Sequence, residues 1–316
     1  MGFEPPVGDP SYLSALPRPE LPPAEGGGER RDHRRPLPPA TPVRGRRPPL
    51  WLVLLLLAVL EIPAIISALR HLPHLDTRGV LVSGIVVLEA IALAVVTVVV
   101  LVGRYARAVG WIPQPGVRRS VRSIGIALVV ASLALLATSA SELGWPASTV
   151  TVLAVNVLMV GIFEETLFRG MLWAALPARW SAARVLLVTS VLFGSWHIFN
   201  GLVTGNWGGA LLQAVFASFL GLGLGALRLR SGWLGLGVLV HASLDAAVTA
   251  GQLVATRPHA EQTLQPTTIV SLLAFEALYV TLGITGVVVL VRTFLAERRV
   301  RRDVAAGDPR LVPQVG

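Results

Sequence analysis

Long apolar stretches fill the middle of the chain, and short polar or arginine-rich connections separate them. Each stretch comes close to the ~20 residues that a helix needs to cross a hydrocarbon core of ~30 Å. The pattern predicts an all-α fold, a polytopic membrane helix bundle of about eight transmembrane helices. The predicted spans are Leu50–Leu69, Gly79–Gly103, Ile124–Ala140, Thr149–Leu176, Arg184–Asn200, Gly209–Leu227, Trp233–Ala250 and Thr267–Phe294.

The connections between these spans alternate between rich and poor in arginine. Because cytoplasmic loops carry an excess of positive residues, this alternation predicts a multi-pass cell-membrane protein with both termini in the cytoplasm. The rich segments are the amino-terminal arm, Arg104–Arg122, Arg169–Arg184, Arg228–Arg230 and Arg292–Arg302, whereas Ala140–Thr149 and Gly201–Gly208 contain no arginine.

Composition divides the chain into one membrane domain and two tails. Residues 1–49 are rich in proline and arginine and have too little apolar surface to offset ordering entropy, so we expect a disordered cytoplasmic arm. Residues 50–295 form the transmembrane domain, with the candidate motifs between 149 and 250, and residues 296–316 form a basic cytoplasmic tail. The net charge of +9 comes entirely from arginine, and in a membrane protein it favours contact with the lipid bilayer and not with nucleic acid.

The absence of cysteine excludes several kinds of site. A chain with 0 cysteines has no disulfides, no thiolate metal ligands and no cysteine nucleophile. A metal site would therefore need histidine and carboxylate ligands. The chain also lacks the serine nucleophile elbow and the H-E-x-x-H helix of zinc proteases.

Ionisable residues inside the predicted fourth span are the first candidates for chemistry. The segment Gly161–Gly170 reads G-I-F-E-E-T-L-F-R-G, and charged side chains at membrane depth are costly enough to indicate function. Glu165 and Arg169 are four residues apart and share a helix face, so they can form an ion pair. Glu164 is turned by ~100° from that face and remains available for chemistry.

Two further spans carry histidines at the same spacing. Phe193 lies four residues before His197, which places an aromatic ring on the histidine's face, and His241 lies four residues before Asp245. At a rise of 1.5 Å per residue, Glu164 and His197 lie ~18 Å and His241 ~12 Å from the cytoplasmic ends of their spans. The three side chains can therefore converge at one site.

Such a cluster can activate water. A buried glutamate can take a proton from water, and imidazoles can orient that water, bind a metal or stabilise an oxyanion. Glu164, His197 and His241 also match the two-histidine, one-carboxylate donor set of catalytic zinc sites. A zinc mechanism and a metal-free mechanism both remain open on these residues.

The three motifs in this order resemble the CPBP intramembrane protease family, which includes the CAAX-prenyl endopeptidase. The motifs are E-E-x-x-x-R at Glu164–Arg169, F-x-x-x-H at Phe193–His197 and H-x-x-x-D at His241–Asp245. The resemblance implies an α-helical membrane endopeptidase whose catalytic cavity opens toward the cytoplasm and the bilayer.

By the same resemblance, Glu164 is the general base, His197 helps to hold the water, and His241 with Asp245 completes the site. Glu165, Arg169 and Phe193 are supporting residues. The family has Asn or Asp at the last position, and an ionised Asp245 donates no hydrogen bond, which favours a metal-binding or histidine-orienting role for it.

The functional hypothesis is an intramembrane (metallo)endopeptidase that cleaves a membrane-associated protein or peptide near the cytoplasmic side. The eukaryotic prenylated substrate is not carried over. One alternative is a non-proteolytic membrane protein, such as a bacteriocin self-immunity or partner-regulating factor. The other is a proton-coupled transporter, since Glu, His and Asp chains also make proton relays.

Other residues in the spans are expected to serve helix packing. The run G-L-G-L-G-A at Gly221–Ala226 predicts close approach between helices, because small residues let backbones come together. Gln213 is expected to hydrogen-bond between helices. Asn200 flanks His197 on another face of an α-helix and receives no role.

Overall fold

The computed structural model describes residues 45–71, 84–113, 119–255 and 266–305, and all regular structure in these ranges is helical. The all-α prediction is therefore confirmed. Most of the predicted amino-terminal arm and the last part of the predicted tail lie outside the described residues.

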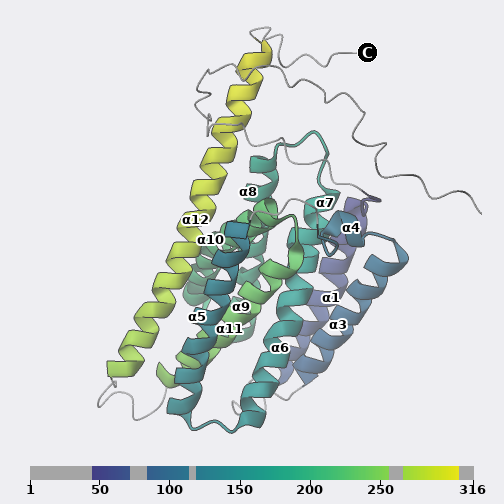
Figure 1. The fold of residues 1–316 in the computed structure, drawn as a ribbon. Helices are drawn as coiled ribbons and strands as arrows, with labels where there is room; N and C mark the ends of the chain where they lie inside the picture. Colours follow the sequence, from purple (N-terminus) through teal and green to yellow (C-terminus); the bar gives the residue numbers. More distant parts are fainter. Residues whose placement is uncertain (1–44, 72–83, 114–118, 256–265, 306–316) are drawn as a thin grey trace, which may run out of the picture. The chain divides into compact units, whose positions relative to one another are not determined.

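The helices (Figure 1) are α1 (Leu50–His71), α3 (Gly84–Val102), α4 (Ala106–Val109), α5 (Arg119–Leu143), α6 (Ala147–Glu165), the π-helix η3 (Thr166–Leu172), α7 (Trp173–Ala175), α8 (Ala182–Trp196), the 3₁₀ turn η4 (His197–Phe199), α9 (Asn200–Thr204), α10 (Trp207–Ser231), α11 (Leu234–Ala255) and α12 (Pro266–Ala305).

Six of the helical segments in the described part of the chain are long and apolar enough to cross a membrane, so this is a multi-pass membrane protein. They are Ser123–Leu143, Ala147–Ala175, Ala182–Leu202, Trp207–Ser231, Leu234–Gly251 and Ala277–Asp303. Two shorter apolar stretches, Leu50–Leu60 and Glu89–Val102, overlap the first two predicted spans. The count of eight spans stays a prediction.

Successive long helices from α5 onward run in opposite directions. The turn between α5 and α6 lies at the bottom of Figure 1, whereas the turn between α7 and α8 and the end of α12 lie toward the top. The arginine-rich connections that precede α8 and follow α10 consequently share an end of the bundle with the carboxyl-terminal turns of α12. We call this the arginine-rich end and the other the arginine-poor end.

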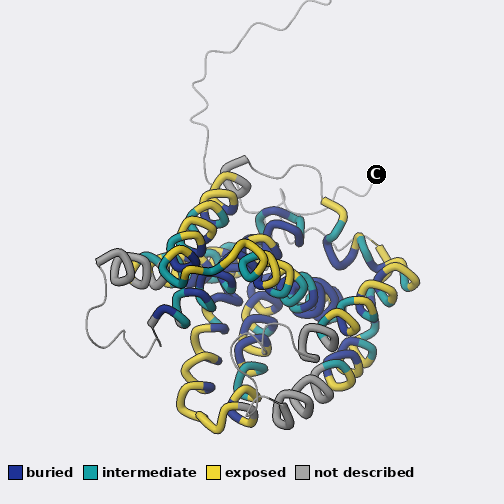
Figure 2. The backbone as a smooth tube through the Cα atoms, turned by 90° about the horizontal axis from the view of Figure 1, so that it is seen from below, coloured by how far each residue is buried: buried dark blue, intermediate teal, exposed yellow. Residues whose placement is uncertain are grey.

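Helices α10 and α11 form the middle of the bundle. Helix α10 packs against α8 and α12, and α11 packs against α5 and α6. Figure 2 shows the buried stretches gathered mainly inside the bundle and the exposed ones on the outer helices. The predicted role of Gly221–Ala226 is confirmed, because Gly223 lies against the backbone carbonyl of Leu282 of α12 with no room for a side chain, and Gly225 lies against the side chain of Leu186 of α8.

Two features at the arginine-rich end differ from the sequence prediction. Helix α12 continues beyond the predicted end of its span at Phe294 as far as Ala305, because arginine is a good helix former and no glycine or proline intervenes before Gly307. The short helix α4 lies in a connection for which no helix was predicted. It ends at Gly110, whose φ of 98° is the left-handed conformation that glycine favours.

Candidate active site

The site is built around the junction between α6 and η3. Glu164 and Glu165 are the last residues of α6, and the following seven residues form a π-helix in which every residue is buried. π-helical turns are rare and often occur at functional sites. The side chain of Glu165 is 1% exposed, whereas that of Glu164 is 18% exposed, so the adjacent carboxylates lie in different environments.

Arg169 is completely buried in the π-helix and is held by two partners. Its Nη1 donates a hydrogen bond to Oε1 of Glu165 over 2.8 Å, which confirms the predicted ion pair. Its guanidinium carbon lies 3.8 Å from the centroid of the Phe193 ring, a cation–π contact between η3 and α8. A Cβ on Gly221 of α10 would lie 2.9 Å from Nη2 of Arg169, so this glycine leaves room for the guanidinium.

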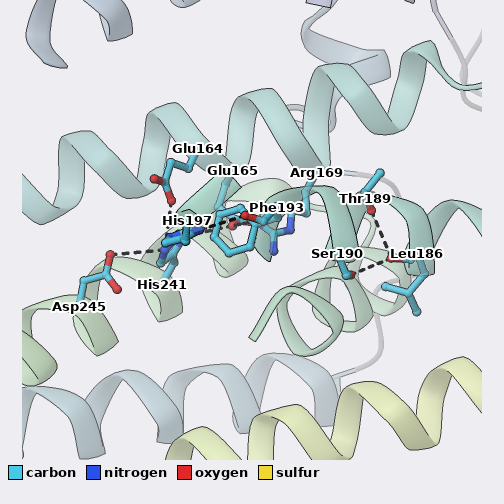
Figure 3. A network of polar contacts seen from close by, with 10 residues as sticks. All are labelled: Glu164, Glu165, Arg169, Leu186, Thr189, Ser190, Phe193, His197, His241 and Asp245. Carbon is cyan, nitrogen blue, oxygen red and sulfur yellow. Dashed lines mark hydrogen bonds and ion pairs between the residues drawn. The ribbon is translucent and has the colours of Figure 1, made fainter. Parts of the chain in front are cut away.

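His241 of α11 lies among three carboxylates (Figure 3). Its Nδ1 donates to Oε1 of Glu165 over 3.1 Å. Its Nε2 lies 3.6 Å from Oε2 of Glu164 and 3.3 Å from Oδ2 of Asp245. The predicted pairing of His241 with Asp245 on one helix face is thus present, and the contact to Glu165 adds a partner that is 76 residues away in sequence.

His197 lies at the end of α8, where the helix tightens into the 3₁₀ turn η4. Its Nδ1 lies 2.9 Å from the carbonyl oxygen of Phe193, and because a carbonyl only accepts, Nδ1 carries the proton. In the neutral ring, Nε2 is then the acceptor. The ring of Phe193 contacts both imidazoles edge-to-face, with its centroid 4.9 Å from that of His197 and 5.7 Å from that of His241.

Close helix packing brings these groups together. A Cβ on Gly161 of α6 would lie 3.3 Å from Cβ of Ala242, and one on Gly237 of α11 would lie 3.3 Å from Oε2 of Glu165. Gly194 of α8 has no room for a side chain because Ser218 and the Ala214 carbonyl of α10 are in contact with it. Each of these glycines lies within four residues of a site residue, so helix approach sets the separation of the ionisable groups.

All seven residues predicted for the site lie in this one network, from α6, η3, α8, η4 and α11. Sequence spacing found the pairs within one helix. It did not find the π-helix, the hydrogen bond between Glu165 and His241, or the packing of Arg169 on Phe193. The one sequence feature that could indicate a second partner for Glu165 is its position next to another glutamate.

A zinc ion fits a site only where several ligand atoms converge on one position. Among the described residues, no three His, Asp or Glu side chains are arranged to hold a metal ion. Nδ1 of His241 is bonded to Glu165, and its Nε2 lies at ion-pair distance from two carboxylates, as in a hydrogen-bonded cluster. This arrangement does not fit zinc ligation by Glu164, His197 and His241, and zinc stays an untested prediction.

Comparison with known proteins identifies the segment that carries the site. Residues 146–247 match the family model described as type II CAAX prenyl endopeptidase Rce1-like. This segment belongs to the CAAX protease family. The CAAX protease segment runs from the start of α6 into α11 and contains all three motifs, so the resemblance seen in the sequence is confirmed. The family indicates an intramembrane protease with a membrane protein or peptide substrate. No curated protein and no solved structure matches the chain.

Proposed function

We propose that this protein is an intramembrane endopeptidase that hydrolyses a peptide bond with a water molecule activated by Glu164 and His197. The observation that carries the proposal is the approach of three separate helices at one point. Glu164 of α6 lies 3.6 Å from His241 of α11, and Phe193 of α8 touches the rings of both His241 and His197. Carboxylate and imidazoles from distant parts of the chain thus line one partly exposed place in the bundle.

Glu164 is the general base in this proposal. It is the more exposed of the two adjacent glutamates, and Arg169 neutralises the other one. Glu164 takes a proton from water as the oxygen attacks the peptide carbonyl carbon. The same proton then passes to the amide nitrogen when the C–N bond breaks, which leaves a carboxylic acid and an amine. Nε2 of His197 accepts a hydrogen bond from the water and orients it.

His241 is the oxyanion-stabilising group. Nε2 of His241 lies near carboxylate oxygens of both Glu164 and Asp245. Without a proton, this nitrogen would be an acceptor facing two other acceptors, so a proton on Nε2 removes their repulsion. With Nδ1–H bonded to Glu165, His241 is then an imidazolium fixed before the reaction begins. A fixed positive donor can stabilise the negative oxygen of the tetrahedral intermediate. Asp245 orients the ring, and no step requires a metal ion.

The experiment compares membrane proteomes of cells that produce the wild type or the Glu164→Gln variant. New protein amino termini should appear with the wild type and be absent with Glu164→Gln and with His197→Ala. Glu142→Gln, on α5 outside the site, is the matched control and should keep cleavage. Identical fragments from wild type and Glu164→Gln would remove the proposed base.

The two alternatives give different results in the same strains. A partner-regulating or immunity protein would confer its phenotype with Glu164→Gln as well as with the wild type. A proton-coupled transporter would move protons in liposomes under a pH gradient, and this flux would depend on Glu164 and Asp245. The peptidase predicts neither result.

A further inference from the structure

An arginine occupies a backbone position at the end of α3 that glycine normally takes. Among the described residues, five glycines have a positive φ, and Arg104, with a φ of 56°, is the one other residue that does. The N–H of Arg104 donates to the carbonyl of Leu101 over 3.1 Å. The N–H of Tyr105 donates to the carbonyl of Val100 over 2.9 Å, which completes the Schellman ending of a helix. Glycine adopts this conformation without steric cost, so an arginine here strains the backbone, and such strain points to a function of its side chain.

Two further arginines lie close to Arg104. Arg107 is on α4, the short helix that begins two residues later. The residues before α1 also reach α4, because a Cβ on Gly45 would lie 3.5 Å from Cβ of Arg107. The guanidinium carbon of Arg46 lies 5.8 Å from the centroid of the Tyr105 ring. Arg46, Arg104 and Arg107 are all exposed, and we call these three arginines the α4 patch.

The positive charge of the α4 patch is not neutralised locally. Residues 45–60 and 101–113 contain no Asp or Glu. Within the described part of the chain, none of the three guanidiniums is paired with a carboxylate. Like charges on neighbouring residues repel one another, and an anion bound among them removes that repulsion. Arginine forms paired N–H bonds to phosphate oxygens, so the patch is complementary to a phosphate group.

Exposed apolar side chains adjoin the α4 patch. Leu101 and Val102 are the last residues of an apolar stretch, and they are 64% and 77% exposed. Ile112, just after α4, is exposed as well. Arginines that directly follow an apolar membrane helix lie at the depth of the lipid headgroups, while the apolar side chains before them contact acyl chains. The combined surface therefore matches an amphiphile with an anionic headgroup better than a free phosphate.

Helix α4 is fixed to three other elements. Val109 is fully buried and packs so closely on Gly170 of η3 that a side chain at this glycine would clash with it. Nη2 of Arg228, on α10, donates to the carbonyl of Val109 over 3.1 Å. The N–H of Leu234, at the start of α11, donates to the carbonyl of Gly110 over 2.9 Å. The backbone that carries the patch is thus held in place before any ligand binds, which lowers the entropic cost of binding.

We propose that the α4 patch binds the phosphate group of an anionic phospholipid, such as phosphatidylglycerol. The acyl chains of this lipid lie against the exposed apolar residues at the end of α3. One molecule then supplies both the negative charge that the arginines lack and the apolar surface that the helix end requires. The lipid site lies outside the cluster of Glu164 and the histidines, and binding there does not depend on the proposed peptidase activity.

Lipid binding would be measured by native mass spectrometry of the full-length protein in detergent. Phosphatidylglycerol or phosphatidylcholine would be added at equal concentrations, so that the two probes share a phosphate and differ in net charge. The wild type should bind phosphatidylglycerol roughly 10-fold or more tightly than phosphatidylcholine. The triple variant Arg46→Gln, Arg104→Gln, Arg107→Gln should lose this preference. Its melting temperature in detergent should remain that of the wild type, because all three side chains are exposed.

The matched control is the triple variant Arg299→Gln, Arg301→Gln, Arg302→Gln, on exposed positions of α12. It lowers the net charge by the same amount and should keep the preference for phosphatidylglycerol. An equal loss in both triple variants would overturn the proposal, because binding would then depend on net charge and not on the α4 patch.

Arg104→Gly separates binding from stability. Glycine favours the left-handed conformation at this position, so the variant should melt at the same or a higher temperature while its affinity for phosphatidylglycerol falls. A lower melting temperature with unchanged lipid affinity would overturn the assignment of Arg104 to the site.

Two results with the wild type would also overturn the proposal. Equal affinity for phosphatidylglycerol and phosphatidylcholine would show that no anionic headgroup is selected. Displacement of phosphatidylglycerol by an equal concentration of glycerol 3-phosphate would identify a soluble phosphate ester, and not a lipid, as the ligand of the patch.

Discussion

One carboxylate oxygen of Glu165 accepts hydrogen bonds from both Arg169 and His241. The donors are Nη1 of Arg169 at 2.8 Å and Nδ1 of His241 at 3.1 Å, all three groups being buried. Glu165 thus neutralises the Arg169 guanidinium of the π-helix and also orients the His241 imidazole of α11. A residue that spacing alone assigns to a structural ion pair also positions a candidate catalytic histidine.

We expect Glu165→Gln to destabilise the protein and abolish cleavage. The change leaves the Arg169 guanidinium buried without its counter-charge, and breaking one side of a buried pair costs about 3–5 kcal/mol. The double variant Glu165→Leu with Arg169→Met should recover most of the thermal stability in detergent but not the activity, because Nδ1 of His241 then has no acceptor. Recovery of both would mean that Glu165 acts only through Arg169.

Asp245→Asn is expected to keep the fold and much of the activity, because the amide oxygen can still accept from Nε2 of His241. Asp245→Ala removes that acceptor. A hydrogen bond to a charged group contributes about 1.5–3 kcal/mol, so cleavage should fall by roughly 10- to 100-fold. Equal loss in both variants would show that the charge of Asp245, and not its hydrogen bond, is required. Cleavage rates of purified variants provide the measurement.

Phe193→Leu should reduce cleavage more than it reduces stability. The ring contacts both imidazoles and the Arg169 guanidinium, and leucine fills much of the volume without these edge-to-face and cation–π contacts. Phe216→Leu, an exposed aromatic on α10, is the matched control. Thermal melting and cleavage rates of both variants test this, and parallel losses in the two properties of Phe193→Leu would indicate packing alone.

Gly194→Ala should lower activity by moving α8 away from α10. The added methyl group meets Ser218 and the Ala214 carbonyl, and overpacking of this kind costs about 1–3 kcal/mol. His197 follows three residues later and would move with the helix. Gly208→Ala, where the nearest atom to a new Cβ is at 3.8 Å, should leave both melting temperature and cleavage unchanged. Wild-type activity in Gly194→Ala would show that His197 tolerates displacement.

Removal of divalent metal is expected to leave cleavage unchanged. The proposed steps use Glu164, His197 and His241 as hydrogen-bonding and proton-transferring groups, and none uses a Lewis acid. Purified protein would be dialysed against a chelator, its zinc content measured by mass spectrometry, and its activity compared before and after. Activity that is lost with zinc and restored by adding it back would establish the zinc mechanism instead.

Features that depend on local geometry could be predicted from the amino-acid sequence alone. The length of the apolar runs indicates membrane helices, and the four-residue spacing of Glu165 with Arg169 and of His241 with Asp245 places each pair on one face, because the helical repeat is set by the backbone. The spacing of Phe193 and His197 was informative for the same reason. Three such motifs in order were enough to indicate the protease family.

Features that depend on contacts between distant segments could be known only from the fold. Glu165 and His241 are 76 residues apart, and no periodicity within a single helix predicts their hydrogen bond. The packing of Val109 of α4 on Gly170 of η3 likewise depends on contacts between segments that are distant in the sequence. The residues that share a helix are placed by backbone geometry alone, whereas the separation between ionisable groups on different helices is set by close packing at glycines such as Gly161, Gly194 and Gly237.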